Sequence, residues 1–184
     1  MEKIKMALGS IDRMSEMIDQ LLSLARAGKG KMSREEVELV SFTQNFAQQS
    51  QRESGRAIEF DTNLAIPLFT LVNEKSLQMI LNNLTQNAIK YSEPATKIQL
   101  QVGSHEGAPF IVIRDHGKGM TKESMDKVFD PFYREMDDAG GAVQGTGLGL
   151  AIVRKLALES DIQVEVVSEK GKGSEFRLIF SPEI

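Results

Sequence analysis

The sequence predicts an α+β fold, a two-layer α/β sandwich in which helices cover one face of a mixed, mostly antiparallel sheet. Short stretches that alternate apolar and polar residues, as strands do, follow one another in pairs separated by turn residues. Longer stretches repeat apolar residues with the helical period, and runs of strands with helices kept to one side form such a sandwich. The 184 residues, 41% of them hydrophobic, suffice for one globular core with a further element attached.

The individual elements follow from the same patterns. Asn73 is a good N-cap for a helix over 74–91 whose buried face carries Leu77, Leu81, Leu84 and Ala88. Further helices are expected at 39–53, 121–128 and 148–159. Strands are expected at 58–62, 68–72, 97–103, 110–115, 162–168 and 174–180, with turns at 106–107 and 170–173. Residues 134–147, rich in Gly, Asp and small side chains, are expected to form a mobile loop.

The N-terminal residues 3–27 are predicted to form one helix with an apolar stripe. The stripe follows alternating steps of four and three residues, with Ser15 as its one gap, through Ile4, Leu8, Ile11, Ile18, Leu22 and Ala25. It must be buried, either against the rest of this chain or as one member of an intermolecular helical bundle. We favour the bundle, because residues 27–31 (AGKGK) end the helix as a domain boundary would. The predicted domains are therefore 1–30 and 31–184.

Composition excludes several functions. With 22 basic and 26 acidic residues the net charge is −4, which argues against a nucleic-acid or anionic-membrane surface. A phosphate site built from backbone N–H groups remains possible. There is no cysteine and there are two histidines, so no zinc site is expected. No apolar run approaches the roughly 20 residues that span a bilayer, so we expect a soluble piece, which is compatible with a longer, membrane-anchored parent chain.

One candidate site lies on the helix at 74–91. Asn83, Asn87 and Lys90 are four and three residues apart, so they share a face turned away from the leucines. An amide oxygen suits Mg²⁺, which prefers oxygen ligands, and a lysine beside it would meet a phosphate. Taken alone, the pattern is more typical of a solvated helix face.

Two glycine-rich segments are further candidates. Residues 115–119 (DHGKG) follow an apolar strand, where a carboxylate can accept from an amino group and glycines let the backbone approach a flat ring, although a simple turn fits equally. Residues 145–149 (GTGLG) open a helix, whose exposed N–H groups and positive dipole end suit a phosphate. Because a loop precedes this segment, it does not match the dinucleotide-binding fingerprint, which follows a strand.

In this order the three segments resemble the ATP-binding domain of the histidine kinases, in the superfamily shared with gyrase, Hsp90 and MutL. The matching segments are 83–92 (NLTQNAIKYS, N box), 115–120 (DHGKGM, first glycine box), 129–134 (FDPFYR, F box), 145–153 (GTGLGLAIV, second glycine box) and 171–176 (GKGSEF). The resemblance covers about residues 34–181 and implies a Bergerat-type ATP-binding fold that takes ATP or ADP with Mg²⁺.

The resemblance also implies residue roles. At the phosphate end, Asn87 is the Mg²⁺ ligand with Asn83 supporting it, while Lys90 and Arg134 contact phosphate. At the base, Tyr91 packs beside the nucleotide and Asp115 accepts from the adenine amino group. The glycines that let adenine lie against the backbone are Gly117 and Gly119, and the residues that cover the phosphates are Gly145, Thr146, Gly147, Leu148 and Gly149. Phe129 and Phe132 are expected to anchor a lid to the core.

Residues 11–27 resemble the second helix of the family's dimerisation and histidine-phosphotransfer bundle, whose first helix, with the phosphoacceptor histidine, is missing from this sequence. The implied reaction transfers the ATP γ-phosphoryl to that histidine and then to an aspartate of a response regulator receiver domain. The implied partners are this receiver domain, the phosphotransfer bundle of the parent chain and a second copy of the parent protein. Autophosphorylation of the chain alone is not expected.

Some positions depart from the family pattern. Asn73 stands where an acidic residue is usual, which we interpret as a change of helix cap, and Ser160-Asp161 replaces the common His-Gly. His116 fills a variable position and is expected at the pocket edge. The alternatives are a serine kinase of the anti-sigma type, or a non-catalytic module that binds nucleotide or a partner protein.

Overall fold

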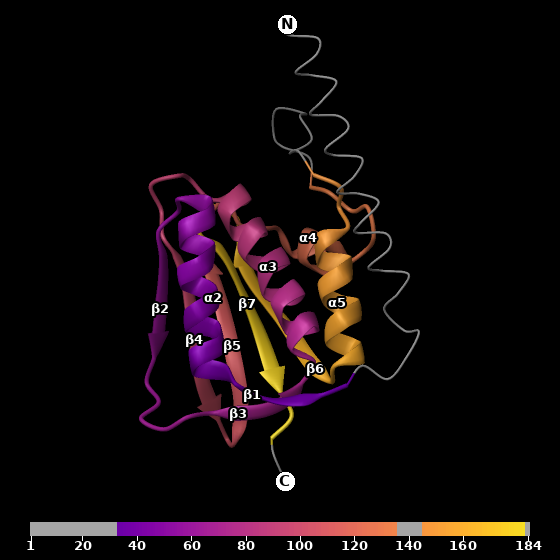
Figure 1. Cartoon of the computed structure of the whole chain (residues 1–184). Helices are drawn as coiled ribbons and strands as arrows, with labels where there is room; N and C mark the ends of the chain where they lie inside the picture. The colour runs from indigo at the N-terminus through magenta and orange to yellow at the C-terminus, as the bar shows by residue number, and fades with distance from the viewer. Residues whose placement is uncertain (1–32, 136–144, 183–184) are drawn as a thin grey trace, which may run out of the picture.

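The computed structural model describes residues 33–135 and 145–182, which form two layers (Figure 1). The helices are α2 (Leu39–Ser54), α3 (Glu74–Tyr91), α4 (Lys122–Lys127) and α5 (Gly149–Glu159). The strands are β1 (Glu35–Glu38), β2 (Ile58–Thr62), β3 (Phe69–Val72), β4 (Ile98–His105), β5 (Ala108–Asp115), β6 (Ile162–Glu169) and β7 (Gly173–Phe180). The helix predicted at 3–27, the boundary near residue 30 and most of the loop predicted at 134–147 lie outside the described residues.

The main sheet has five strands in the order β2-β4-β5-β7-β6. Only β2 and β4 pair in parallel, and the other three pairings are antiparallel, which confirms the predicted mixed, mostly antiparallel sheet. The β4–β5 hairpin closes at the predicted turn, where Glu106 and Gly107 take φ angles of 52° and 82°. Both strands leave this turn in register, with His105 opposite Ala108.

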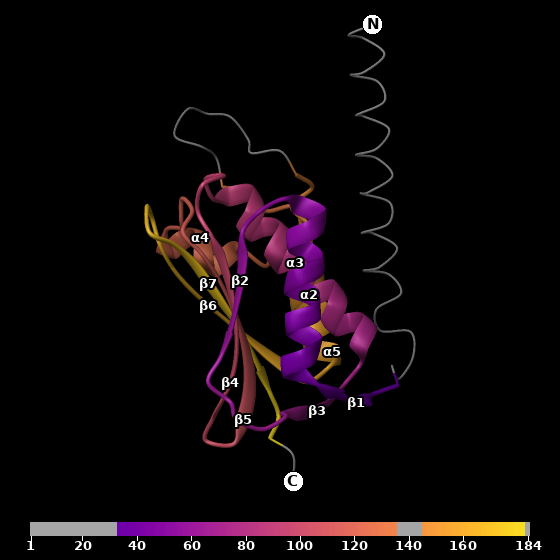
Figure 2. The same cartoon turned by 60° about the vertical axis from the view of Figure 1, so that its left-hand side comes forward.

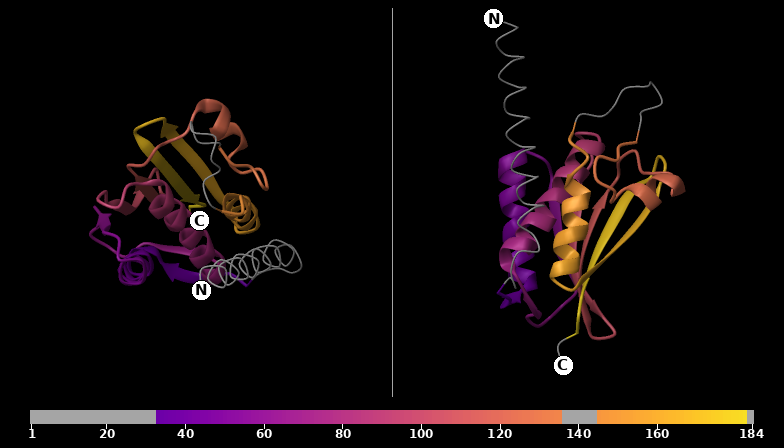
Figure 3. Two further views of the ribbon diagram at one scale, coloured as in Figure 1. Left: turned by 90° about the horizontal axis from the view of Figure 1, so that it is seen from above. Right: turned by 90° about the vertical axis from the view of Figure 1, so that its right-hand side faces the viewer.

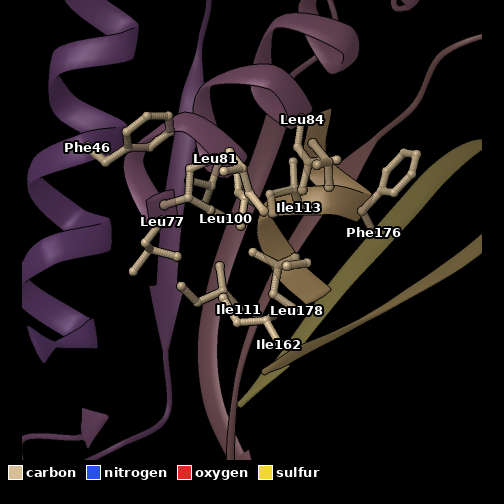
Figure 4. Close-up of a cluster of buried hydrophobic side chains, with 14 of the residues drawn as sticks. Phe46, Leu77, Leu81, Leu84, Leu100, Ile111, Ile113, Ile162, Phe176 and Leu178 are labelled. Atoms are coloured by element: carbon tan, nitrogen blue, oxygen red, sulfur yellow. The ribbon is translucent and has the colours of Figure 1, made fainter. Parts of the chain in front are cut away.

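Three helices, α2, α3 and α5, lie along one face of the sheet, and the other face carries none of the described helices (Figures 2 and 3). Alternation along β4 sends Ile98, Leu100 and Val102 towards the helices, and all three are fully buried. From the helix side, Leu77, Leu81 and Leu84 of α3 reach the same core (Figure 4). The apolar residues that alternate along β4 and those that recur with the helical period in α3 therefore pack together in one apolar layer.

Two strands depart from the prediction. The strand expected at 68–72 exists as β3, but it pairs antiparallel with β1 in a separate two-stranded sheet. β1 was not predicted, because its sequence EEVE has one apolar residue and no readable alternation. The pairing is supported by Glu38, whose carboxylate accepts from the Val40 and Leu68 amides at 3.0 and 3.1 Å. Partial burial raises the Glu38 pKa, but hydrogen bonds from Ser41 first, and then from Leu68 and Val40, outweigh it and hold this pKa below its ordinary value.

Helix α3 begins as predicted. The Asn73 side chain accepts from the Ser76 amide at 2.9 Å, which satisfies one of the free N–H groups at the helix start. From there α3 runs through the middle of the helical layer to the upper end of the molecule in Figure 1, where β5 also ends and α5 begins. Within residues 33–135 and 145–182, no helix is long and apolar enough to cross a membrane.

Candidate functional site

Three segments far apart in sequence meet at this upper end. The Lys118 amide, just beyond β5, donates to the Tyr91 carbonyl at the end of α3 at 3.2 Å. Gly117 lies so close to the same carbonyl that a Cβ atom there would collide with it. Gly145 and Gly149, at the start of α5, face α3 from its other side. The topology thus brings together the three candidate segments of the sequence.

The polar face of α3 meets the glycine-rich start of α5. A Cβ atom on Gly149 would lie 2.9 Å from Asn83 Oδ1, and one on Gly145 would collide with Lys90 Nζ. Asn83 turns its Nδ2 back to the Met79 carbonyl at 2.8 Å, which leaves Oδ1 directed at Gly149. The half-buried side-chain amide of Asn87 lies between Asn83 and Lys90 along the helix. It makes no hydrogen bond within the described part of the chain. Its oxygen is therefore available to a ligand.

Two lysines flank the Tyr91 ring. Lys90 Nζ lies 4.8 Å from the ring centroid and 3.3 Å from the hydroxyl, while Lys118 Nζ lies 5.1 Å from the centroid. Both distances are typical of cation–π contacts. Lys118 was not among the predicted site residues, because its place between two glycines is its only signal in the sequence. Together the two ammonium groups make the surface around Tyr91 attractive to an anionic ligand, although the chain as a whole carries a net charge of −4.

Asp115 ends β5 as a buried carboxylate with 6% of its surface exposed. Burial raises the pKa of this carboxyl, and hydrogen bonds from Gly117 and Ser174 oppose the rise only in part. The Gly117 amide donates to Asp115 Oδ1 at 2.8 Å, which fixes the carboxylate at the strand end. A buried acceptor in a defined orientation is suited to selecting one donor group on a ligand.

Helix α5 starts without a side-chain cap. Leu148 occupies the N-cap position and makes no capping hydrogen bond, and its side chain is 1% exposed and so anchored in the core. Thr146 Oγ1 accepts from the Leu148 amide at 3.2 Å. Gly147 has a φ of 74°, which favours glycine, and its carbonyl accepts from the Phe132 amide at 2.9 Å. The N–H groups of the first turn of α5 are therefore not satisfied by a cap, as in anion sites at helix starts.

Residues 72–184 match the family model described as histidine kinase-, DNA gyrase B- and HSP90-like ATPase. The chain belongs to this ATPase family. Sensor histidine kinase YkoH of Bacillus subtilis is 32% identical over 169 residues, which make up 91% of this chain and 37% of that protein. Aerobic respiration control sensor protein ArcB of Escherichia coli is 32% identical over 167 residues, 84% of this chain and 21% of that protein. The chain thus spans less than two fifths of the length of these relatives.

Solved structures agree with the fold of this ATPase domain. Full-length ShkA in complex with AMPPNP superposes on 99% of this chain and 39% of that chain, with a TM-score of 0.79 and 26% identity. Histidine kinase AdeS of Acinetobacter baumannii gives a TM-score of 0.75 at 19% identity, over 98% of this chain and 84% of that chain, which bears on the fold alone. The predicted fold class and the predicted histidine-kinase type of ATP-binding domain are confirmed. The serine kinase of the anti-sigma type and the non-catalytic module are not favoured.

The ATPase domain corrects one expectation about its phenylalanines. Phe129 does anchor its segment, because it packs edge-on against Phe176 with ring centroids 6.4 Å apart. Phe132 was expected to anchor as well, but its side chain is 61% exposed. A turn with a φ of 66° at Phe132 directs the ring outwards and the amide towards Gly147, so the backbone makes the anchor. Arg134, two residues on, is exposed.

The side chains of the described residues limit which kind of metal ion could bind. No group of three or more His, Cys, Asp or Glu side chains in residues 33–135 and 145–182 could hold a metal ion. The amide oxygen of Asn87 fits a hard cation that keeps waters and phosphate oxygens as its other ligands. His116, the residue after Asp115, is exposed.

Proposed function

We propose that this chain is the Mg-ATP-binding catalytic part of a two-component sensor histidine kinase. One observation carries the proposal. The amide-and-lysine face of α3, the buried Asp115 and the uncapped start of α5 lie at the same end of the sandwich and touch through Gly117, Gly145 and Gly149. The AMPPNP bound by the related ShkA supports a nucleotide as ligand.

At the base end, Asp115 selects adenine by accepting from its amino group. Gly117 and Gly119 let this backbone pack against the Tyr91 and Glu169 carbonyls, where a Cβ atom would collide, and the adenine ring lies against the segment so placed. Tyr91 closes this end beside the nucleotide, with the Lys118 ammonium 5.1 Å from its ring centroid. A base that lacks the amino group would offer this buried carboxylate no further donor beside those of Gly117 and Ser174, which favours adenine.

At the phosphate end, Asn87 provides an oxygen ligand for Mg²⁺ and Asn83 supports it. An ion held there would supply positive charge that offsets the charge of the phosphates. Lys90 and Arg134 meet phosphate oxygens as cations, and the first N–H groups of α5 bind them from residues 145–149. These residues orient the triphosphate and stabilise charge, which is the main contribution a protein makes to phosphoryl transfer.

In the proposed reaction an imidazole nitrogen attacks the γ-phosphorus, the bond to the bridging oxygen breaks and ADP leaves. The accepting histidine is not in this chain. His105 pairs with Ala108 in the β4–β5 turn, at the opposite end of β5 from Asp115, and on the order of 20 Å away for seven residues of strand. His116 lies at the base end, far from the transferred group.

The remaining roles extend beyond the described residues. The phosphotransfer bundle of the parent chain, to which residues 1–30 contribute a helix, presents the histidine and joins two copies. A response regulator receiver domain then takes the phosphoryl group on an aspartate. The parent chain is anchored in the bacterial inner membrane with this domain in the cytoplasm. Nucleic acid is not a partner.

Calorimetry of the chain with ATP and GTP analogues, with and without Mg²⁺, tests the binding part. We expect preference for the adenine nucleotide and tighter binding with Mg²⁺, and equal affinity for ATP and GTP would overturn the site assignment. Incubation with labelled ATP tests the reaction. The chain alone should gain no acid-labile phosphate, whereas a supplied helical acceptor with a histidine should. Label on this chain that is lost in His116→Gln would contradict the proposal.

A further inference from the structure

Arg56 lies outside the site, in the short connection between α2 and β2, and its guanidinium reaches the end of α3. Nη1 donates to the Ile89 carbonyl at 3.1 Å. Nη2 lies within hydrogen-bond distance of three acceptors, the Ser92 hydroxyl at 3.0 Å and the Glu93 and Thr96 carbonyls at 2.7 and 3.1 Å. One cation thus joins the last turn of α3 to the turn that follows it.

The end of α3 depends on this side chain. A helix terminates with unpaired carbonyl groups and the negative end of its dipole, and a left-handed glycine commonly closes it. Here the C-cap is Ser92 in an extended conformation, and its hydroxyl donates to the Ala88 carbonyl at 2.6 Å. Arg56 supplies the further donors and a positive charge at the negative dipole end. Hydrogen bonds with an ionised donor are stronger than neutral ones.

The same turn of α3 supports the purine end of the site. The Tyr91 carbonyl accepts from the Lys118 amide and touches Gly117, and Gly117 in turn donates to Asp115. We infer that Arg56 is a positioning residue for nucleotide binding: by fixing the end of α3, it sets where Tyr91 holds residues 117–118 and therefore where Asp115 meets the base. This inference rests on the proposed function.

A positioning role at the base end has a distinct signature. Adenosine, ADP and an ATP analogue all share the base, so loss of Arg56 weakens all of them by a similar factor. We expect each of these affinities to fall about tenfold, which corresponds to the free energy of one lost hydrogen bond. The ratio of ATP affinities with and without Mg²⁺ stays at the wild-type value, because the Asn87 end of the site is not displaced.

The test compares Arg56→Met, which keeps the aliphatic stem, with Arg56→Lys, which keeps the charge but not the fork of donors. Arg177→Met is a matched control, since Arg177 in β7 also pairs through its guanidinium, with Glu175 at 3.2 Å, but lies outside the site. Binding is measured by calorimetry well below each variant's melting temperature. We expect wild-type affinity in Arg177→Met, an intermediate loss in Arg56→Lys and the full loss in Arg56→Met. A lower melting temperature with wild-type affinity for adenosine would overturn the inference.

Hydrogen exchange gives a readout that needs no ligand. In the empty domain the Lys118 amide, which is bonded to Tyr91, should exchange faster in Arg56→Met and in the milder Ser92→Ala, and at the wild-type rate in Arg177→Met. Unchanged Lys118 exchange in both test variants would also overturn the inference. The two proposals fail separately: a wild-type chain that binds no nucleotide contradicts the proposed function, whereas the exchange result decides whether Arg56 positions this segment.

Discussion

The Gly117 amide donates to Asp115 Oδ1 at 2.8 Å, and this hydrogen bond fixes a carboxylate that burial would otherwise favour in its neutral form. Burial raises the Asp115 pKa despite this bond. A group whose pKa is higher in the folded state contributes stability at pH values below its unfolded pKa, and that contribution is lost as the pH rises through its folded pKa. As the pH rises from acid to neutral, Asp115 therefore stabilises the empty domain less.

Asp115→Asn should make the empty domain more stable at neutral pH while it impairs adenine binding. The neutral amide keeps an acceptor for Gly117 and removes the buried charge. The melting-temperature advantage of Asp115→Asn over the wild type should be small near pH 4, close to the ordinary aspartate pKa of 3.8, and should grow towards pH 7. ATP binding should weaken roughly 10- to 150-fold, as for a lost hydrogen bond to a charged group. Thermal melts from pH 4 to 8 and calorimetry measure the two effects, and a less stable variant at pH 7 would contradict the argument.

Asn87→Leu should abolish the enhancement of ATP binding by Mg²⁺. Leucine keeps helix α3 but offers no oxygen ligand, so we expect a loss of about 10- to 100-fold in the metal-dependent part of the affinity. Asn82→Leu is the matched control, because Asn82 is an exposed asparagine on the same helix, about 100° round the helix axis from Asn83. Titrations with and without Mg²⁺ decide the point. If both variants keep the wild-type metal dependence, Asn87 is not the ligand.

Gly147→Ala should destabilise the domain more than Gly171→Ala. Both glycines have positive φ, 74° and 83°, so both alanines incur a similar backbone strain. A Cβ on Gly147 would also lie 2.8 Å from the Phe132 carbonyl carbon, whereas one on Gly171 meets no atom within 4 Å. We expect about 1 kcal/mol from strain alone at Gly171 and about 2–3 kcal/mol at Gly147, with weaker binding of triphosphate only at Gly147. Chemical denaturation provides the comparison, and equal losses would show that the Gly147–Phe132 contact relaxes freely.

Asn73→Asp should loosen the first described residues without unfolding α3. Asn73 accepts from Ser76 with Oδ1 and donates to the Ser33 carbonyl with Nδ2 at 2.9 Å, and an aspartate can only accept. The family's usual acidic residue would thus keep the cap and lose the second bond. The side chains that still bind this segment to the rest of the domain include Arg34, which pairs with Asp161 at 2.5 Å, and Glu38, which accepts from the Leu68 amide. We expect a stability change below about 1 kcal/mol and faster amide exchange confined to residues 33–38. Faster exchange throughout α3 would instead show that the cap was lost.

Much of this protein was determined by local sequence. The bounds of α3 follow from the Asn73 cap and the leucine spacing, and the β4–β5 turn from Glu106-Gly107, because capping and periodicity act within a few residues. The shared face of Asn83, Asn87 and Lys90 follows from the helical period alone. The order of the motifs was enough to indicate the family.

Tertiary structure decided the features that depend on contacts between distant segments. β1 exists because β3 pairs with it, and its charged sequence gives no periodic signal. The outward Phe132 ring follows from a backbone turn fixed by Gly147, and aromatic character alone predicted burial. The raised Asp115 pKa and the reach of Arg56 to the end of α3 likewise arise only when strand, helix and loop pack together. Desolvation and long-range hydrogen bonds depend on residues that are distant in sequence, so the spacing of residues along the chain does not predict them.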